Sequence, residues 1–455
     1  MNQDLYKGNT SVETIDDELG SLHNVVEIAI KEARESGASE SEAAASVSQG
    51  LPVTVRKGNI ETVEHTRDRG LSVTVYFGDR VGNAATSDYS VASVRQTVEA
   101  ACSIARFTEE DPCHGLADPD RLATEFPDLD LYHPQELSID EMVELSQRCE
   151  HAALAFDPRI ENSEGAATDS HKGSEVYGNS HGFRGESKKT RHGISCSVIG
   201  KANGNMQRDY WYTVARRFKD LQEASEVGKT AGARTARRLN ARKIQTCQSP
   251  VLFEAPVASS LLGHFIGAIS GGSLYRRASF LLDHLGKRIF PDFVRIYEQP
   301  MLQRALGSAA FDSEGVATES SDIVADGILE RYLLGSYSAR RLGLKTTGNA
   351  GGVHNLTIDG SGEELPHLIT RMDRGLLVTE LIGFGVNSVT GDYSRGAAGF
   401  WIEDGEIQFP VEEVTIAGNL KQMFNSIVAI GSDFDTKQNI RSGSILVDGL
   451  TIAGQ

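Results

Sequence analysis

The apolar positions near the start of the chain follow two different periods. Residues 22–36 place apolar side chains at the spacing of an amphipathic helix and stop before Gly37, a good helix terminator. Residues 91–107 repeat this helical pattern. Between them apolar and polar residues alternate, which predicts short strands separated by turns at Lys57-Gly58-Asn59 and Gly78-Asp79. The expected strands are residues 43–48, 52–56, 60–66, 71–77 and 81–87.

The same order of elements returns after residues 108–137, an acidic linker that contains four prolines. Ser138 followed by Glu141 is a capping-box signature, and it opens a helix that reaches about Phe156. The repeated order of helix, strands and helix indicates a duplicated architecture, with units at 1–107 and 138–247. The further elements expected in the second unit are strands at 160–168, 173–179, 192–200 and 207–215 and a helix at 223–239.

The composition changes over residues 248–455, where glycine and β-branched residues become more frequent. Asp326-Gly327 and Asp404-Gly405 each separate two alternating apolar runs, which is a strong hairpin signal. These residues therefore predict a strand-rich C-terminal domain. The whole chain is expected to have an α+β fold, with duplicated helix–strands–helix units followed by this β-rich domain.

Charge and composition limit the classes of partner. The 455 residues hold 45 Lys and Arg against 63 Asp and Glu, a formal charge of −18, so the summed field repels nucleic acid and anionic lipid. No apolar run approaches the roughly 18 residues of a membrane helix, and the first residues are polar and acidic. Five cysteines without a CxxC pair fit a reducing compartment, so we expect a cytoplasmic chain with no nucleic-acid or membrane partner.

Three short motifs are weak. Gly228-Lys229-Thr230 ends like a phosphate loop, but Glu223 stands where the loop needs glycine. Residues 178–182 match GxSxG, yet the charged, glycine-broken segment after them predicts a hairpin loop instead of the required helix. His171, His181 and His192 could meet as metal ligands on adjacent strands, although loop histidines bonded to backbone are favoured.

Longer segments resemble a known family. Residues 259–277 read SSLLGHFIGAISGGSLYRR and follow an apolar run at Val251–Phe253. Together with residues 311–319, 326–352, 390–420 and 443–455, they resemble the TldD/PmbA family, historically called modulators of DNA gyrase. The resemblance is closer to the PmbA (TldE) branch.

The resemblance implies a metal-dependent peptidase system. In the TldD branch a helix with the pattern LLHExxGHxxEGDFxRR carries two zinc ligands and the general base, and a cysteine near the C-terminus is the third ligand. The family complex is a TldD–TldE heterodimer that cleaves extended or unfolded peptides, including peptide-antibiotic precursors and antitoxins.

This chain departs from the pattern at each metal position. Gly263 falls on the first ligand, His264 on the base and Ala268 on the second ligand. No cysteine follows Cys247, and Ser442 stands where the third ligand is wanted. A hydroxyl is a poor substitute for a thiolate. We therefore expect no catalytic residue and no metal in this chain, zinc in a TldD-type partner, and for His264 a local hydrogen bond.

Two glycine-containing loops are candidates for holding an extended peptide by strand addition. A local role, in which the glycines supply turns and the charged residues bond nearby, is equally open. The peptide-binding candidates are Gly351, Gly352, Asp392, Tyr393, Ser394 and Arg395.

The leading hypothesis is a partner subunit of a cytoplasmic TldD/TldE metalloprotease complex that binds extended peptides and itself lacks the zinc site. One alternative is a self-sufficient homodimeric metallopeptidase with ligands from His171, His181, His192 or His354. Another is a regulatory modulator of DNA gyrase that acts through protein contacts. Residues 280–293 could contribute to a dimer interface or to the core.

Overall fold

The computed structural model describes residues 15–454, in two compact units. The first unit comprises residues 15–49, 66–119 and 172–189, and the second comprises residues 50–65, 120–171 and 190–454. The polar and acidic first residues fall mainly on residues 1–14, outside the described part.

In the first unit two helices pack with antiparallel strands. Helix α1 (Ile15–Glu35) and helix α2 (Val91–Phe107) contact β3 (Thr66–Phe77), and α2 also packs against β4 (Arg80–Thr86). A Cβ added at Gly82 would lie 2.2 Å from the carbonyl oxygen of Ala101, so β4 and α2 touch through backbone. Both helices were predicted from the sequence, and both are confirmed.

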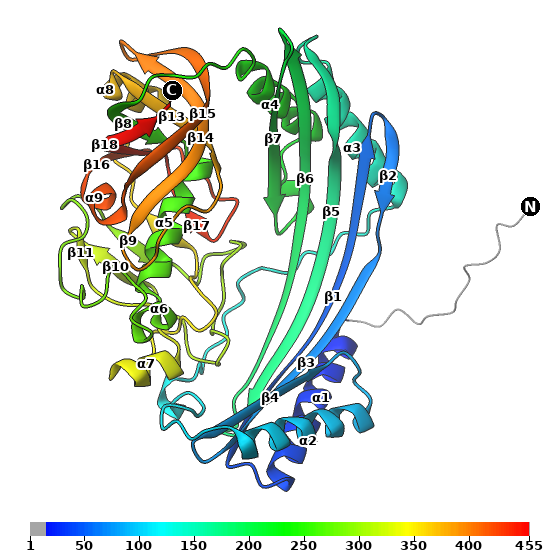
Figure 1. Cartoon of the computed structure of the whole chain (residues 1–455). Helices are drawn as coiled ribbons and strands as arrows, with labels where there is room; N and C mark the ends of the chain where they lie inside the picture. Colours follow the sequence, from blue (N-terminus) through cyan, green and yellow to red (C-terminus); the bar gives the residue numbers. More distant parts are fainter. Residues whose placement is uncertain (1–14, 455) are drawn as a thin grey trace, which may run out of the picture. The chain divides into compact units, whose positions relative to one another are not determined.

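The second unit begins with a sheet covered by two helices. Its strands run in the order β2 (Asn59–Val63), the end of β1 (Glu40–Arg56), the start of β5 (Ile160–Asn179), the end of β6 (Arg184–Ala202) and β7 (Asn205–Ala215), so β7 is an edge strand. The remaining residues of β1, β5 and β6 belong to the first unit. Helix α3 (Ile139–Leu154) packs against α4 (Ala224–Arg237), and α4 packs on β7 (Figure 1).

The strands are longer than the sequence predicted. The runs at 43–48 and 52–56 belong to one strand, β1, and those at 160–168 and 173–179 belong to β5. The expected breaks were wrong because burial continues to alternate along β1 on both sides of Gly50. Pro52 has no N–H, but its carbonyl still accepts a hydrogen bond from Glu64 N at 3.1 Å.

The capping box of α3 is present as predicted. Ser138 Oγ accepts from Glu141 N at 3.2 Å, while Glu141 Oε2 accepts from Ser138 N at 2.8 Å. Helix α4 also forms, and Gly228-Lys229-Thr230 lies inside it, so this stretch is no phosphate loop. A short 3₁₀ turn, Pro119–Arg121, lies in the linker, and another, Phe218–Asp220, precedes α4.

The C-terminal part of the second unit contains two sheets. The larger has the strand order β15-β14-β13-β8-β18-β16, and the smaller has the order β11-β10-β9-β12-β17. The bounds of the larger sheet are β8 Cys247–Phe253, β13 Gly375–Ile382, β14 Asp392–Glu403, β15 Glu406–Asn419, β16 Ile427–Ile430 and β18 Ile445–Ala453. Those of the smaller are β9 Ile296–Glu298, β10 Ser321–Ala325, β11 Ile328–Leu329, β12 Leu356–Ile358 and β17 Ile440–Arg441.

Both predicted hairpins of this part are confirmed. Asp326-Gly327 joins β10 to β11 with φ of 48° and 74°, and Asp404-Gly405 joins β14 to β15 with φ of 54° and 69°. Positive φ at both central residues is typical of a type I′ turn, whose backbone twist matches the twist of the two paired strands. The α+β fold class with a strand-rich C-terminal region is therefore confirmed.

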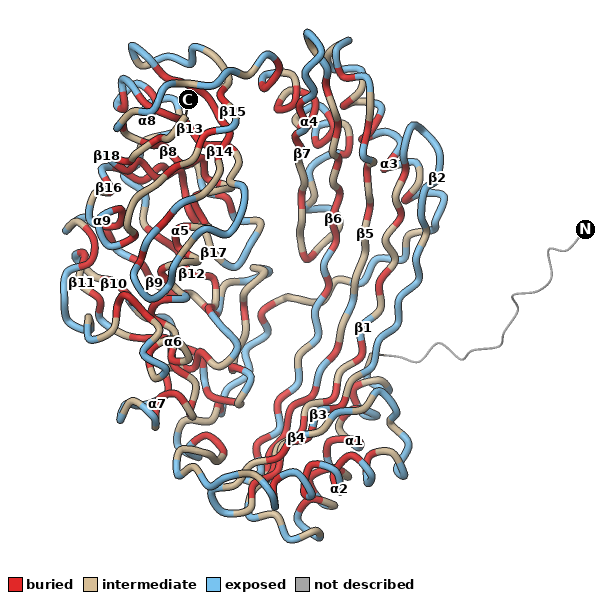
Figure 2. The backbone as a smooth tube through the Cα atoms, viewed as in Figure 1, coloured by how far each residue is buried: buried red, intermediate tan, exposed pale blue. Residues whose placement is uncertain are grey.

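Alternate residues of the larger sheet build two cores. On one face Val251, Phe253 and Val378 join a cluster with helix α5 (Ala255–Ile269), and on the other Leu252 and Leu377 pack with helix α8 (Leu365–Met372). Figure 2 shows the buried backbone of these strands and of α5. The remaining helices are α6 Gly271–Tyr275, α7 Ser336–Leu342 and α9 Leu420–Asn425.

Two helical glycines should respond oppositely to alanine. A Cβ at Gly228 would lie 1.9 Å from the carbonyl oxygen of Cys149, whereas a Cβ at Gly267 of α5 meets nothing within 4 Å. We expect Gly228→Ala to lower stability to urea by about 1–3 kcal/mol through overpacking. Gly267→Ala should raise it by up to about 1 kcal/mol, because alanine favours helix. A destabilised Gly267→Ala variant would contradict this packing.

Candidate functional site

The segment that resembles the zinc helix forms two helices instead of one. Helix α5 starts after Glu254, and its first backbone amide, Ala255 N, donates to Ser444 Oγ at 3.0 Å. It ends at Ile269, because Ser270 is extended with φ −72° and ψ 140°, and the short α6 follows. The apolar face of α5 is anchored by Phe265, whose ring lies 5.2 Å from that of Phe290.

The positions that match the zinc ligands differ in surroundings. Gly263 is partly exposed, and a Cβ there would meet no atom within 4 Å. Ala268 is buried, and its carbonyl accepts a hydrogen bond from Ser279 Oγ. Ser442 follows β17, which packs against α5; it is fully buried, and its Oγ donates to Gly443 O at 2.7 Å.

These residues do not fit a zinc ion. Zinc in proteins is bound by thiolate, imidazole or carboxylate groups. Gly263 offers a hydrogen atom, Ala268 a methyl group, and Ser442 a hydroxyl that already donates a hydrogen bond, so none of the three supplies such a ligand. Across residues 15–454 no group of three His, Cys, Asp or Glu side chains is placed to hold a metal.

His264, at the position of the base, packs against β14. Its ring meets that of Tyr393 edge to face, with centroids 6.0 Å apart. Its Nε2 is buried without a hydrogen-bond partner, so this nitrogen does not make the local hydrogen bond expected from the sequence. Burial lowers the pKa of His264, and the charge of Arg395 lowers it further, which keeps the imidazole neutral at pH 7.

Two of the peptide-binding candidates lie beside His264. Tyr393 is 1% exposed, and its hydroxyl has no hydrogen-bond partner within ordinary distance. Burial raises the pKa of Tyr393 to about 12, with Arg395 opposing the rise. Arg395 Nε donates to Gly383 O at 3.0 Å, and its guanidinium makes no ion pair within the described part of the chain. The site therefore groups a neutral imidazole, a phenol and a free cation.

The other candidates of this turn are engaged locally or exposed. Asp392 accepts from Thr390 Oγ1 at 2.6 Å and from Asn419 Nδ2 at 3.2 Å, and these bonds lower its pKa. Ser394 is exposed, and its backbone N donates to Gly385 O. Phe384, in the loop that joins β13 to β14, is 99% exposed.

Gly351 and Gly352 line a separate cavity of about 380 Å³ at the end of α5. The lining also includes Glu314 and the pair Tyr275 and Tyr337, whose ring centroids lie 5.5 Å apart in an edge-to-face contact. At Gly351 φ is +100°, and a Cβ would lie 2.5 Å from Ser313 Oγ. The structure therefore separates these glycines, which border α6, from Tyr393 and Arg395, which border His264.

A buried aspartate holds the glycine loop. Asp312 is 3% exposed and accepts from Ala350 N at 2.9 Å and from the amides of Glu314 and Val316. Burial, with the charge of Glu314, raises the pKa of Asp312 to about 7. Glu298, also buried, accepts from Asn349 Nδ2 at 3.0 Å. Glu298 thus ties the glycine loop to β9 of the smaller sheet, and Asp312 ties it to the turn at residues 312–316.

Three of the four histidines considered as metal ligands, His181, His192 and His354, have hydrogen-bond partners. His192 is buried, with Nδ1 3.0 Å from Ser170 Oγ and Nε2 3.1 Å from the carbonyl of His133. Burial lowers its pKa. His354 Nε2 lies 3.2 Å from Gly348 O.

The description of these histidines as loop residues bonded to backbone was partly wrong. His171 lies in β5, because this strand is longer than expected, and His192 lies in β6, at the start of the strand expected at 192–200. His181 does lie in a turn, but its Nε2 meets the side chain of Glu40 at 3.0 Å. That turn leads directly into β6, so the GxSxG match is the predicted hairpin loop.

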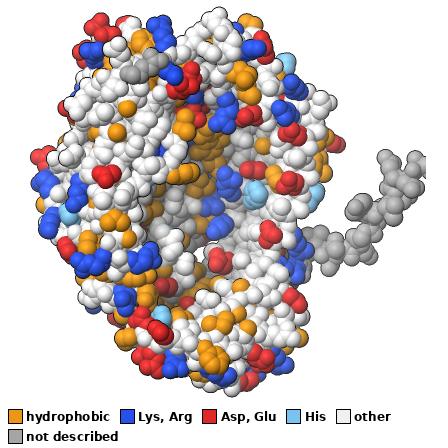
Figure 3. All heavy atoms as spheres, viewed as in Figure 1, with side chains coloured by type: hydrophobic (Ala, Val, Ile, Leu, Met, Phe, Trp, Pro, Cys, Tyr) orange, Lys and Arg blue, Asp and Glu red, His pale blue; other side chains and the backbone are white. Residues whose placement is uncertain are grey.

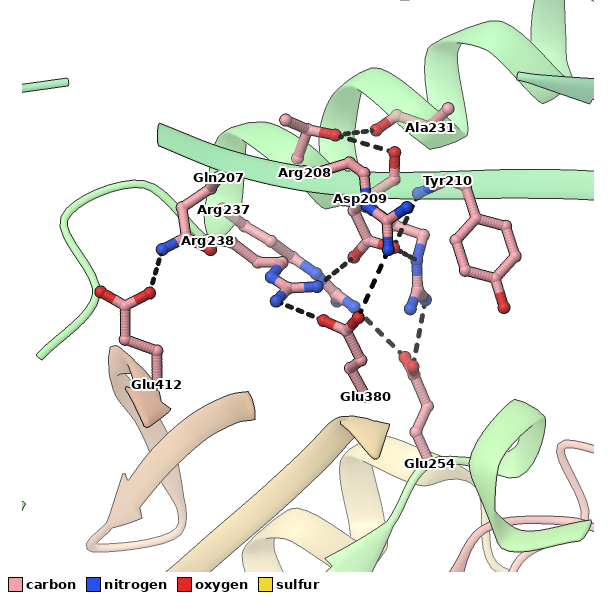
Figure 4. Close-up of polar contacts among 12 residues, drawn as sticks. Gln207, Arg208, Asp209, Tyr210, Ala231, Arg237, Arg238, Glu254, Glu380 and Glu412 are labelled. Carbon is pink, nitrogen blue, oxygen red and sulfur yellow. Dashed lines mark hydrogen bonds and ion pairs between the residues drawn. The ribbon is translucent and has the colours of Figure 1, made fainter. Parts of the chain in front are cut away.

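An ion cluster that the sequence analysis missed fixes the start of α5 (Figure 4). Arg234 of α4 contacts Glu254 at 3.0 Å and Asp209 at 3.4 Å, and Arg238 contacts Glu380 of β13 at 2.5 Å. Asp209 is 3% and Glu254 8% exposed, so these charges are largely desolvated. The sequence signal that could have indicated this cluster was Asp209, an acidic residue at an inward-facing position of the strand predicted at 207–215.

Three family models match consecutive segments of the chain. They describe domain 1, the central domain and the C-terminal domain of PmbA/TldA metallopeptidases, at residues 41–105, 132–239 and 246–454. The matches define a chain of the metallopeptidase class. It belongs to the PmbA/TldD family, so the resemblance found in the sequence is confirmed.

Relatives match over nearly the full length. The chain is 51% identical to metalloprotease PmbA of Escherichia coli O157:H7, covering 95% of this chain and 96% of that one. It is 48% identical to the PmbA homologue of Haemophilus influenzae, with the same coverage. A TldD homologue of Buchnera aphidicola is 21% identical over 88% of each chain.

Solved structures have the same fold. A crystal structure from Bacteroides thetaiotaomicron, described as a candidate modulator of DNA gyrase, gives a TM-score of 0.91 at 28% identity and covers 97% of this chain and all of its own. TldE from Thermococcus kodakarensis gives 0.82 at 21% identity over 95% of this chain and 100% of its own, which shows the fold alone.

Removing one cation from the ion cluster should destabilise the second unit. In Arg234→Met, Glu254 loses its closest partner and Asp209 loses a contact, so stability to urea should fall by about 3–5 kcal/mol. The control, Lys229→Met, breaks an exposed pair with Glu226 and should change stability by less than about 1 kcal/mol. Equal losses of stability in Arg234→Met and Lys229→Met would show that the ion cluster is not desolvated.

Asp312 should give a pH dependence of known sign. Between its ordinary pKa of 3.8 and its folded value of about 7, the folded state keeps a proton that the unfolded chain has lost. Its contribution to stability therefore falls as pH rises from about 4 to about 7 and is then constant. Asp312→Asn should gain stability relative to the parent between pH 5 and pH 8 in urea titrations. The exposed control Asp404→Asn should show no such trend.

Proposed function

We propose that this chain is the non-catalytic PmbA/TldE-type subunit of a TldD/TldE metallopeptidase complex, and that zinc is held by a TldD-type paralogue. The observation that carries the proposal is the α5 scaffold, on which Gly263 and Ala268 offer no zinc ligand, together with Ser442 after β17, which offers none either. The match to a TldD homologue over 88% of both chains supports a shared architecture with such a partner.

The proposed substrates are extended or unfolded peptides, such as peptide-antibiotic precursors and antitoxins, in the cytoplasm. The edge strand β7 offers backbone groups for strand addition, which needs no particular sequence. A nucleic-acid ligand is disfavoured by the charge of −18 and by the mixture of acidic and basic side chains on the face shown in Figure 3. No helix among residues 15–454 is long and apolar enough to cross a bilayer.

Two other functions have weaker support. A self-sufficient homodimeric metallopeptidase would need ligands from His171, His181, His192 or His354, but both ring nitrogens of His192 already have partners. A modulator of DNA gyrase acting through protein contacts agrees with the description of the Bacteroides relative. Neither function accounts for the altered positions on α5.

Metal content and cleavage test the proposal together. The purified chain should contain far less than one equivalent of zinc by elemental analysis and should not cleave an unfolded peptide. Addition of the TldD-type paralogue should give chelator-sensitive cleavage. A paralogue whose two ligand histidines are replaced by alanine is the matched control and should stay inactive in the mixture.

The opposite result is equally clear. One tightly held zinc per isolated chain, with cleavage that a chelator stops, would refute the proposal. The homodimer alternative further requires that His181→Ala or His354→Ala reduce cleavage. Under the proposal both variants keep the activity of the mixed complex.

A further inference from the structure

A cavity of about 310 Å³ lies in the second unit where β7 ends, beside β17. Its wall contains three arginines, Arg216, Arg304 and Arg441, and one acidic residue, Asp220. The rest of the wall is apolar or neutral, including Gln438 and Thr436. A chain with 63 acidic and 45 basic residues thus collects basic groups at one enclosed place.

Arg216 is the most unusual of the three arginines. It is 6% exposed, with Nη1 donating to Thr190 O at 3.0 Å and Nη2 to Leu306 O at 2.7 Å. Its Nε is buried without a partner, and the guanidinium makes no ion pair in the described chain. Burial, with the nearby charge of Arg191, lowers its pKa to about 10. A buried cation without a counter-ion is costly unless an anion joins it.

The acidic residues around the cavity are already paired. Asp220 receives two hydrogen bonds from Arg217, at 2.7 and 2.8 Å, and Asp130 pairs with Arg304 at 2.7 Å. Arg441 makes no ion pair with any described carboxylate. Two cations, Arg216 and Arg441, are therefore left without a counter-charge in one cavity.

One residue of the cavity wall is the sequence neighbour of a position that matches a zinc ligand. Arg441 immediately precedes Ser442, the position of the third ligand, and β17 packs against α5. Val214 and Ala215, which also line the cavity, end the edge strand β7. A peptide held along that edge would therefore reach the cavity with one end.

We propose that this cavity binds a carboxylate of the peptide, first of all its C-terminal carboxylate, through Arg216 and Arg441. The inference rests on the proposed peptide ligand. Arginine binds carboxylates with paired, charge-assisted hydrogen bonds. A volume of about 310 Å³ suits the end of a peptide, whereas the negative charge of the whole chain repels long polyanions.

Calorimetric titration of the full chain with an N-acetylated oligoalanine tests the proposal. The peptide with a free C-terminal carboxylate should bind at least about tenfold more tightly than the same peptide as a C-terminal amide. Arg441→Met should abolish this difference, and added salt should reduce it. The matched control is Arg374→Met, which removes an exposed arginine just before β13.

Further peptides identify the source of the carboxylate. An amidated peptide with an internal glutamate that binds as tightly as the free acid would assign the cavity to acidic side chains and still support carboxylate binding. Acetate or phosphate that binds as tightly as the free acid would overturn the peptide assignment. Equal binding of acid and amide would overturn the whole proposal.

A conservative variant distinguishes lost binding from lost folding, and the titration does not depend on the proposed partner. Arg216→Lys, which keeps the charge and loses the paired donors, should bind the acid more weakly, whereas unchanged binding would exclude Arg216. Because titration uses this chain alone, a failed partner-dependent cleavage assay would not alter the acid–amide difference. Conversely, equal binding of acid and amide would leave the metal analysis unaffected.

Discussion

The structure depends most on the burial of α5 in the C-terminal core. Leu261, Leu262 and Phe265 are at most 2% exposed and pack with residues of both C-terminal sheets. This apolar contact keeps the helix in place although Gly263 and Gly267 weaken it, each by up to about 1 kcal/mol relative to alanine. The donors of a metal site are not needed for that packing, so they can be lost while the scaffold persists.

Charge adds a second constraint at the start of the same helix. Glu254 precedes α5 and is held by Arg234, while Arg238 joins Glu380 of the neighbouring strand β13. Buried ion pairs add little net stability, but they penalise any arrangement that leaves one member unpaired. The cluster therefore specifies the position of α5 relative to α4. Residue types on the exposed face of α5 can therefore change while the helix stays in place.

The sequence predicted the types of element well because the helical and alternating periods are strong, as in α2 and at the Asp404-Gly405 hairpin. It failed on strand lengths, because Gly50 and Pro52 indicate a break that the sheet tolerates. The proposal that Gly263, Ala268 and Ser442 replace zinc ligands rests on residue identity. The unpartnered Tyr393 hydroxyl and the unpaired Arg216 could not be predicted from the sequence, because burial and the absence of a counter-ion are properties of tertiary structure.

The central claim is that a scaffold related to a zinc site has exchanged its donor atoms for hydrogen, methyl and hydroxyl groups. The most direct measurement is anomalous scattering at the zinc edge from crystals of the isolated chain soaked with zinc. We predict no peak beside Gly263, Ala268 and Ser442. A peak there, with His264 or Ser442 in contact with the ion, would contradict the claim.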